Sequence, residues 1–276
     1  MQLEPWPIPS GWASLIDEYS VASLGAAHSR ETVKLRRSHL AHLARGLGGD
    51  PWAVTLPQLL GFVGAQDWAV ETRRSRRTTY RGFWAWGHAM CYTDDNIAAR
   101  LPRVKPAEPV PMPVPMEELA TALARADQRE WVILKLAVDA GLRRSEIARI
   151  HVGRDLGRDL VGWSLVVHGK GGKVRVLPLP ASLAMGLLAR GQGFAFEGAV
   201  EGHLSARRVG EVAQGVLPAP WTIHKLRHRF ATDMHNEYGN LEAVRKLLGH
   251  ASVATTQRYI KTDDAVLRAM MERRAL

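Results

Sequence analysis

Apolar residues recur at helical spacing through most of the chain. The first hundred residues hold one such run over 29–47, which ends at Gly48, and another that follows Thr55 and has Pro57 in its first turn. Threonine is a favourable N-cap, and proline is tolerated in a first turn because its missing N–H would find no helical acceptor there. A further helix is expected over 71–92, where a basic half precedes an aromatic half. The pattern predicts an N-terminal segment of several short helices.

After residue 115 the helical spacing continues with one interruption. Two aliphatic, β-branched runs, 165–167 and 174–177, flank a Gly-Lys-Gly-Gly sequence, which predicts a β-hairpin with a glycine-rich tip. The expected fold class is therefore mainly α with a small antiparallel β-sheet. Helices are expected over 116–125, 130–140, 145–150 (capped by Ser145), 182–190, 205–214, 222–238, 241–248 and 263–274, with a short one through Tyr259.

A proline-rich stretch separates the two halves. Six of the chain's 15 prolines lie between Leu101 and Pro115. Proline lacks an amide donor and disfavours helix in the preceding residue, so this stretch should be extended and semi-rigid. We therefore expect one domain over 1–100, a linker over 101–115 and a second domain over 116–276.

Composition narrows the class of partner. The 276 residues carry a formal net charge of +10, with a sequence pI near 10.2, which favours a polyanion because phosphate contacts release condensed counterions. The single cysteine, Cys91, cannot form an internal disulfide, and no stretch reaches the ~20 apolar residues of a membrane span. The start of the chain has no secretory signal pattern. We expect a cytoplasmic protein with a nucleic-acid partner and no membrane partner.

The basic half of the helix expected over 71–92 is the clearest candidate DNA surface. Its arginines fall within nine positions with no acid between them, which favours a phosphate-tracking face over the alternative of a solvated basic turn. The aromatic half that follows should fill a core. The arginines are Arg73, Arg74, Arg76, Arg77 and Arg81.

The last fifth of the chain holds residues suited to phosphodiester cleavage. His224, Arg227, His250 and Tyr259 follow one another, and Arg143 lies upstream in AGLRRSEI. A phenol can attack phosphorus, and arginines can hold the non-bridging oxygens and neutralise the charge that builds on them. This set predicts cleavage by a protein nucleophile.

A metal site is a weaker interpretation of the same segment. His224 and His228 have the i, i+4 spacing of a zinc-binding helix, but Lys225 stands where such a site uses a glutamate as its base. His224 and Arg227, at i and i+3, instead share one helix face, where an anion between them would explain the pair. We expect no metal and no cofactor.

Taken together, the chain resembles a tyrosine recombinase of the phage integrase family. Four segments carry the resemblance in the family's order: AGLRRSEI from residue 140, GKGGKVRVLPL from 169, HKLRHRFAT from 224 and LGHASVATTQRY ending at Tyr259. Ala140 and Ile223 depart from the threonine and proline common in the family. The resemblance implies a helical, SAM-like core-binding domain followed by a catalytic domain. Because the linker comes early, it also implies the short two-domain form without an arm-binding domain.

The resemblance also implies a role for each matching residue. Arg143 and Arg227 would hold the scissile phosphate, and Tyr259 would attack it to leave a 3′-phosphotyrosyl link and a free 5′-hydroxyl. Lys170, at the hairpin tip, would protonate the departing 5′-oxygen. The remaining roles are proton transfer from the phenol for His224, a hydrogen bond to a phosphate oxygen for His250, and support of the site for Glu146 and His228.

Several of these residues have two alternative roles. Lys173 and Lys225 compete with Lys170 as the general acid, and His228 is either a structural histidine or part of the site. Lys173 and Arg175 are expected to contact the DNA backbone, the alternative being that they are merely solvated. The C-terminal helix packs either on its own domain or on a neighbouring protomer.

The function expected from these residues is site-specific DNA recombination, most simply the integration and excision of a phage or other mobile element in a bacterial host cell. Resolution of chromosome or plasmid dimers by an Xer-like enzyme is the alternative, and a DNA-binding regulator that has kept only the fold is a third. The expected partners are double-stranded DNA at core attachment sites and further copies of the chain, as a dimer on each core site and a tetramer in the synapse. A host or phage accessory factor that bends DNA or sets direction is a further candidate partner.

Overall fold

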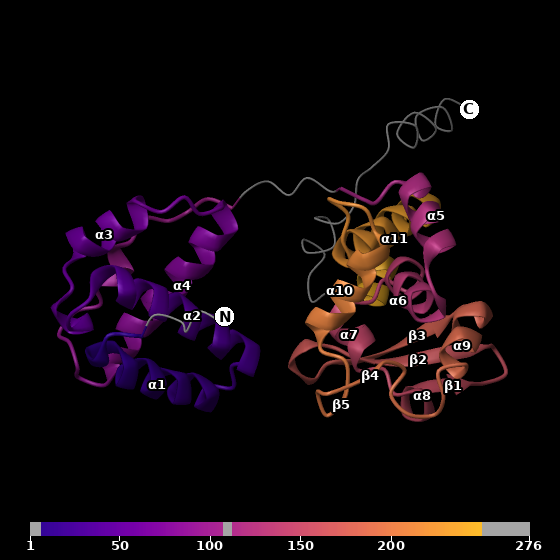
Figure 1. Cartoon of the computed structure of the whole chain (residues 1–276), viewed down its shortest axis with the longest axis horizontal. Helices are drawn as coiled ribbons and strands as arrows, with labels where there is room; N and C mark the ends of the chain where they lie inside the picture. Colours follow the sequence, from indigo (N-terminus) through magenta and orange to yellow (C-terminus); the bar gives the residue numbers. More distant parts are fainter. Residues whose placement is uncertain (1–6, 107–111, 250–276) are drawn as a thin grey trace. The chain divides into compact units, whose positions relative to one another are not determined.

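The protein divides into two compact units, Met1–Glu108 and Pro109–Leu276. The structure is a computed structural model that describes residues 7–106 and 112–249, without the side chain of Lys170, and each unit is considered by itself (Figure 1). Most described residues are helical, and the described strands form small antiparallel sheets, as expected from the sequence. None of the helices in the described ranges has the length and apolarity needed to cross a membrane.

The first unit is a helical bundle around an aromatic core. Phe83 stacks on Trp52, with ring centroids 5.1 Å apart, and Trp84 is 1% exposed, so the aromatic half of the 71–92 segment does fill the core. The Ser29 and Thr55 side chains each accept a hydrogen bond from a backbone N–H in the first turn that follows. The elements are α1 (Ser10–Gly25), α2 (Arg30–Leu47), η1 (Pro51–Ala53), α3 (Leu56–Gly64), α4 (Val70–Ala89) and η2 (Ile97–Arg100).

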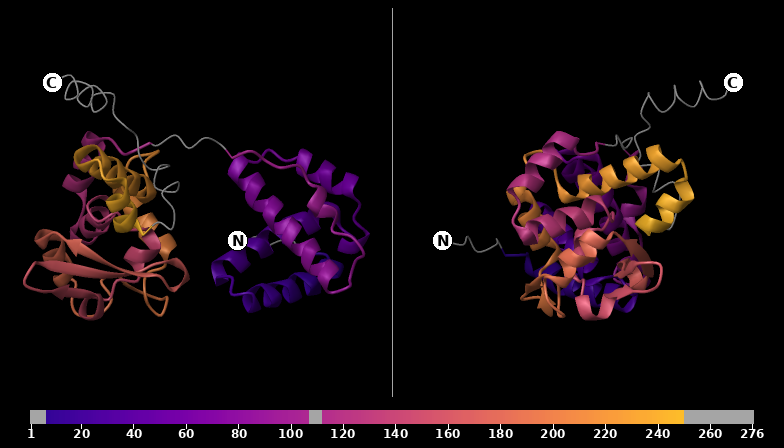
Figure 2. Two further views of the ribbon diagram at one scale, coloured as in Figure 1. Left: turned by 180° about the vertical axis from the view of Figure 1, so that it is seen from behind. Right: turned by 90° about the vertical axis from the view of Figure 1, so that its right-hand side faces the viewer.

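In the second unit, α5, α6, α10 and α11 lie together on one side of a three-stranded sheet (Figures 1 and 2). Its helices are α5 (Met116–Arg125), α6 (Gln128–Val138), α7 (Arg144–Ala148), α8 (Val152–Asp155), α9 (Ala181–Leu188), α10 (Ala206–Val216), α11 (Ile223–Tyr238) and α12 (Leu241–Leu248). Its strands are β1 (Leu156–Arg158), β2 (Trp163–His168), β3 (Val174–Leu179), β4 (Glu197–Gly198) and β5 (Gly202–His203), with η3 (Lys170–Gly172) between β2 and β3.

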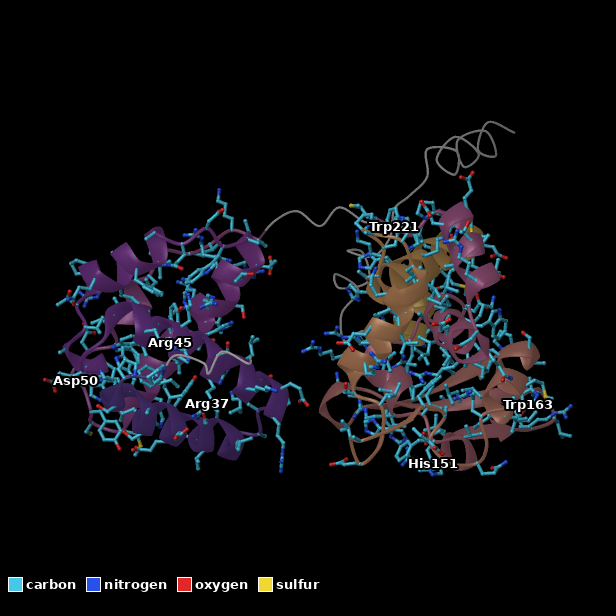
Figure 3. All side chains as sticks on the ribbon, viewed as in Figure 1. Arg37, Arg45, Asp50, His151, Trp163 and Trp221 are labelled. Carbon is cyan, nitrogen blue, oxygen red and sulfur yellow. The ribbon has the colours of Figure 1, made fainter. Side chains whose placement is uncertain are left out.

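The sheet has the order β1-β2-β3 and is antiparallel throughout. Its β2–β3 hairpin matches the expectation from the sequence, whereas the short β1 was not predicted. Leu165 pairs with Leu177, and both side chains are buried, while Val176 on the opposite face is 64% exposed. The alternation therefore fixes which side of β3 faces the helices. Figure 3 shows that side chains fill the interior of each unit.

The boundary between the units falls within the proline-rich segment. The described residues at its two ends belong to different cores, since Leu101 packs in the core of the first unit and Val114 in that of the second. Arg77 donates two hydrogen bonds to the Leu101 carbonyl, at 3.1 and 2.8 Å, and fixes the point where the chain leaves the first unit.

Candidate active site

The site is built around the start of α7. Arg143 is the N-cap residue of this helix, so the expectation that Ser145 caps it is wrong by two positions. The Glu146 carboxylate takes over the capping role, because it accepts a hydrogen bond from the Arg143 backbone N–H at 2.9 Å. The same carboxylate accepts a second bond from the Arg143 guanidinium at 2.8 Å. A single acidic residue thus fixes both the backbone and the side chain of Arg143.

Glu146 also contacts two further arginines. Arg175 on β3 donates to both carboxylate oxygens, at 2.9 and 3.0 Å, and the Arg227 Nη1 atom lies 3.7 Å away. Burial of this carboxylate, whose side chain is 1% exposed, would by itself raise the pKa of Glu146. The hydrogen bonds and charge of Arg175, the Arg143 backbone N–H and the charge of Arg227 outweigh burial and lower that pKa to about 2. Glu146 is therefore ionised at neutral pH, and one carboxylate serves three guanidinium groups.

Two of these arginines meet at the carbonyl oxygen of Leu248, the last residue of α12. Arg227 donates to this oxygen at 2.7 Å, and Arg143 approaches it at 3.5 Å. Arg175 donates to the neighbouring Leu247 carbonyl at 2.9 Å. The C-terminal end of a helix carries partial negative charge, so it attracts cationic side chains. The end of α12 therefore gathers guanidinium groups from α7, β3 and α11.

Arg227 is fully buried and is held from the other side by Gly141, whose carbonyl accepts a hydrogen bond from its guanidinium. Gly141 adopts a φ of +61°, and a Cβ there would lie 2.5 Å from the Phe230 ring. Only glycine fits that conformation and that close approach. This geometry accounts for the glycine in AGLRRSEI.

His224 and His228 lie one turn apart at the start of α11, with ring centroids 4.9 Å apart and the rings nearly perpendicular. Solvent reaches His224, but the surrounding protein partly desolvates its ring, and this desolvation lowers its pKa together with the charges of Arg227, Arg143 and Arg144. Burial and the neighbouring His224 lower the pKa of His228 to about 4. Both imidazoles are therefore neutral at pH 7.

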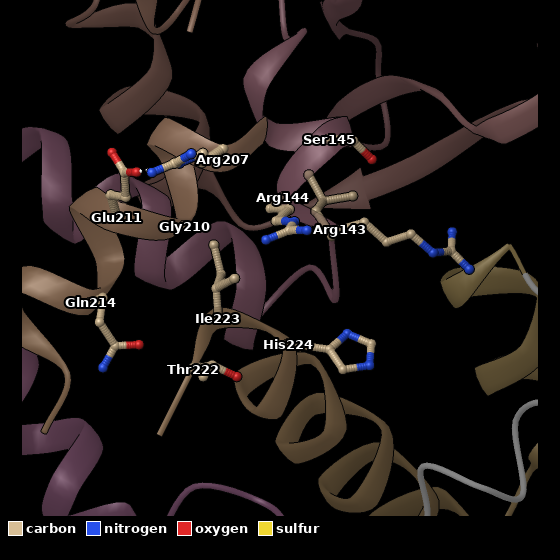
Figure 4. Close-up of a pocket in the computed structure, with 11 residues that line it drawn as sticks. Arg143, Arg144, Ser145, Arg207, Gly210, Glu211, Gln214, Thr222, Ile223 and His224 are labelled. Atoms are coloured by element: carbon tan, nitrogen blue, oxygen red, sulfur yellow. Dashed lines mark hydrogen bonds and ion pairs between the residues drawn. The ribbon is translucent and has the colours of Figure 1, made fainter. Parts of the chain in front are cut away.

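A cleft of about 630 Å³ opens beside these residues. Figure 4 shows Arg143 and His224 projecting to one side of it, with side chains of α10 on the other. Arg144 lies next to Arg143 and also lines the cleft, so the positive charge continues along its wall. The α10 residues that line it are Arg207, Gly210, Glu211 and Gln214.

Three predicted site residues cannot be placed through their side chains. His250 and Tyr259 lie outside the described residues, and Lys170 is placed only by its backbone, in η3 at the tip of the β2–β3 hairpin. Lys173 is exposed. Across 7–106 and 112–249, no group of three or more His, Cys, Asp and Glu residues is arranged to hold a metal ion.

Arg175 does not lie where the sequence analysis expected it. Instead of projecting toward solvent, its side chain is 14% exposed, and its guanidinium is bonded to Glu146 and to the Leu247 carbonyl. Strand alternation carries the signal that was missed, because position 175 shares a face of β3 with the buried Leu177 and Leu179. Arg175 thus supports Glu146 from within the second unit, and its expected contact with the DNA backbone stays a prediction.

The arginines of α4 also differ from a uniform phosphate-tracking face. Arg73 donates to the Val63 and Gln66 carbonyls, at 3.2 and 2.8 Å, and so fixes the turn before α4. Arg76 lies over the Trp68 ring, 4.3 Å from its centroid, because the start of α4 packs against its neighbours.

Of the other three arginines of this set, two are half-buried and one is exposed. Arg74 pairs with Glu71 at 2.9 Å, Arg77 binds the Leu101 carbonyl, and Arg81 is exposed. Arg74 and Arg77 line a groove of about 330 Å³ together with Arg103, which the sequence analysis did not single out. The basic residues at the start of the proline-rich segment were the available signal.

Comparison with known proteins places the chain in a family. Residues 203–265 match the model of the phage integrase family. The chain is 30% identical over 237 residues to the tyrosine recombinase XerC of Chromobacterium violaceum, with 78% of this chain and 77% of that protein covered. The chain belongs to the tyrosine recombinase family. A XerD recombinase of Caulobacter vibrioides is also 30% identical, over 76% of this chain and 77% of that protein.

Solved structures agree with this recombinase fold. A lambda integrase dimer bound to a COC′ core site superposes with a TM-score of 0.72 at 17% identity, covering 89% of this chain and 76% of that one. The XerH recombinase bound to its difH substrate superposes with a TM-score of 0.66 at 16% identity, covering 97% of both chains. As a tyrosine recombinase, the protein is a DNA breaking-and-rejoining enzyme that carries out site-specific recombination.

Proposed function

We propose that Arg143 and Arg227 hold the scissile phosphate of the recombination site. The convergence of both side chains on the Leu248 carbonyl supports this role, since it brings two guanidinium groups from distant segments to one point. Glu146 compensates only one of the three arginine charges around it, so the cluster retains positive charge for an anion. A planar guanidinium suits the bidentate binding of phosphate oxygens.

In the proposed reaction, the Tyr259 oxygen attacks the phosphorus and displaces the 5′-oxygen of the next nucleotide. His224 accepts the phenol proton, a task supported by its lowered pKa, which keeps the imidazole unprotonated at neutral pH. Lys170 donates a proton to the departing 5′-oxygen, and His250 donates a hydrogen bond to a phosphate oxygen. The products are a 3′-phosphotyrosyl link and a 5′-hydroxyl, which reverses the reaction when it attacks the link.

We also assign the two units to a DNA clamp, with residues 1–100 as core-binding domain, 101–115 as linker and 116–276 as catalytic domain. Relatives of the same fold include a lambda integrase dimer on a core site and a lambda integrase tetramer on a Holliday junction. By analogy, this recombinase acts as a dimer on each core site and as a tetramer in the synapse. We place it in the bacterial cytoplasm and expect an accessory DNA-bending or directionality factor as a further partner.

A trapping assay tests the proposed chemistry. The protein is incubated with a nicked core-site duplex from which a short fragment diffuses away after cleavage, so that the covalent intermediate accumulates. A protein–DNA band that survives denaturation is expected with the wild type and not with Tyr259→Phe, which lacks the nucleophilic oxygen. A band of equal strength with Tyr259→Phe would show that another residue attacks the DNA.

The relatives named XerC and XerD support a second candidate role, the resolution of chromosome or plasmid dimers. Our first choice remains integration and excision of a phage or other mobile element. A cell-based assay separates the two roles: integration requires recombination between two different attachment sites, whereas dimer resolution requires two identical sites. Recombination of identical sites alone would favour the Xer-like role.

The groove at the start of α4 is proposed to bind the DNA backbone. Arg103 is exposed there, and its charge lowers the pKa of Arg77 after the larger effects of burial and of Arg81, as expected of neighbouring like charges. Arg103→Ala should weaken DNA binding equally across sequences and reduce the slope of log K against log salt by about 1. Fluorescence anisotropy over a salt series measures this slope. An unchanged slope would place Arg103 away from the DNA.

A further inference from the structure

The β2–β3 hairpin that carries Lys170 at its tip is fixed at its root by a residue with no role in the proposed chemistry. His168 is the last residue of β2, two positions before Lys170. Its Nε2 atom lies 3.1 Å from the Oδ1 atom of Asp155, at the end of α8. A carboxylate accepts hydrogen bonds only, so Nε2 carries the hydrogen and His168 donates.

Asp155 is a firm anchor for this contact. Its side chain is 2% exposed and accepts hydrogen bonds from the His151 backbone N–H at 2.9 Å and from Arg154 at 2.7 and 2.9 Å. Burial alone would raise the pKa of Asp155, but these hydrogen bonds, together with that of His168, outweigh it and lower the pKa. The carboxylate is therefore ionised and held from several sides, whereas His168 is 40% exposed.

The backbone of His168 is tied down as well. Arg149 donates to the His168 carbonyl at 2.9 Å and to the Ser145 carbonyl at 3.0 Å. Ser145 lies in α7, the helix that begins at Arg143. Arg149 thus links the end of β2 to α7, the helix that begins at the proposed phosphate ligand Arg143.

The other strand of the hairpin is attached to the same helix. Arg175, the second residue of β3, donates to both carboxylate oxygens of Glu146 in α7. Both strands are therefore fixed close to the tip, β2 through His168 and β3 through Arg175. The segment between them, which includes Lys170, is short and contains two glycines with positive φ, Gly171 and Gly172. Because the segment is short, the two fixed strand ends limit where it can lie.

We propose that His168 is a positioning residue, which through Asp155 holds the root of the hairpin so that Lys170 meets the 5′-oxygen leaving the phosphate. This inference rests on the proposed role of Lys170 as general acid. Its signature is specific: loss of the His168–Asp155 hydrogen bond impairs protonation of the leaving group and leaves DNA binding and nucleophilic attack intact.

The test compares two nicked duplexes that differ in one atom. One carries the natural oxygen at the 5′-bridging position of the scissile phosphate, and the other carries sulfur. A thiol has a pKa of about 8.5, far below that of an alcohol, so a thiolate leaves without a proton. Single-turnover cleavage rates are measured on both duplexes with the wild-type protein and with Lys170→Ala, His168→Ala, His168→Leu and His168→Gln.

We expect His168→Ala and His168→Leu to cleave the oxygen duplex about 10- to 100-fold more slowly than wild type. General-acid catalysis contributes roughly 10²–10⁴-fold to a rate, and much of this contribution is lost when the acid is misplaced. On the sulfur duplex both should match wild type. His168→Gln, whose Nε2 can still donate to Asp155, should recover most of the rate on oxygen. Ser164→Ala, on the same strand and the same face as His168, is the matched control and should cleave both duplexes normally.

The outcomes separate the inference from the mechanism on which it rests. Two outcomes would overturn the positioning role, provided that sulfur still rescues Lys170→Ala. One is an unchanged rate of His168→Ala and His168→Leu on the oxygen duplex, and the other is an equal loss on both duplexes at an unchanged melting temperature. Failure of sulfur to rescue Lys170→Ala would instead remove Lys170 as the acid, and the positioning role with it. Melting temperatures of the variants show whether an equal loss on both duplexes reflects unfolding.

Discussion

Arg227→Ala should lower the rate of covalent complex formation by about 1,000-fold or more. Removal of a single donor that stabilises developing charge in a transition state costs about 10²–10³-fold in characterised enzymes. Arg227 also fixes the site itself, since it joins the Gly141 and Leu248 carbonyls from a fully buried position. Its loss therefore removes a proposed phosphate ligand and loosens the contact between α12 and the start of α7.

Arg227→Lys and Arg229→Ala are the matched comparisons for this variant. Lysine keeps the positive charge but not the planar fork, so Arg227→Lys should remain severely impaired. Arg229 lies on the same helix but binds Asp233 and the Val114 carbonyl, so Arg229→Ala should cleave normally. Covalent trapping measures cleavage, and anisotropy measures DNA binding. Cleavage by Arg227→Lys at the wild-type rate would show that charge alone suffices.

Glu146→Gln should have the largest effect on stability, lowering the free energy of unfolding by about 3–5 kcal/mol, the usual cost of removing one partner from a buried ionic cluster. The amide keeps the shape of the side chain but leaves Arg143, Arg175 and Arg227 without their shared carboxylate. Thermal and urea denaturation measure the loss. Glu211→Gln is the control, because this exposed carboxylate also binds two arginines and its loss should leave the melting temperature almost unchanged.

The Glu146 carboxylate also makes the stability of the protein depend on pH in the acidic range. The pKa of Glu146 is lowered to about 2 in the folded protein, against an ordinary value of 4.5. Its stabilising contribution, on the order of 3 kcal/mol, is complete above the unfolded value and disappears as the pH falls from about 4.5 through 2. Glu146→Gln should therefore lose less stability than wild type over that interval. Parallel acid-denaturation curves for the two proteins would contradict this assignment.

Sequence motifs were enough to identify the arginines of the site but not the contacts that hold them. Arg143 and Arg227 stand out because each occurs in an ordered motif, and the structure brings them to one carbonyl. The role of Arg175 depends on which face of β3 meets α7, and that follows only from the burial of Leu177 and Leu179. Ser145 was chosen as a helix cap by residue type, whereas Glu146 performs that function through its hydrogen bond to the Arg143 N–H.

The α4 arginines show a different limit of sequence analysis. A run of like charge predicts a polyanion surface, but an arginine can equally bind carbonyls and lie over aromatic rings of its own domain, as Arg73 and Arg76 do. Which of the two occurs depends on how neighbouring helices pack, and no local pattern encodes that packing. Arg103 was missed because it lies in the proline-rich segment, outside the periodic helix pattern.

The anchoring of α12 has a kinetic consequence. Tyr259 is the tenth residue after Gly249, which directly follows the carbonyl that both arginines approach. Ten peptide units span at most about 35 Å, so the Tyr259 Cα atom is tethered within that distance of the Gly249 Cα atom, beside the proposed phosphate site. A tether of this length gives the proposed nucleophile an effective concentration in the millimolar range. Cleavage by a tethered nucleophile is unimolecular, so once the DNA is bound its rate does not depend on how much free protein surrounds it.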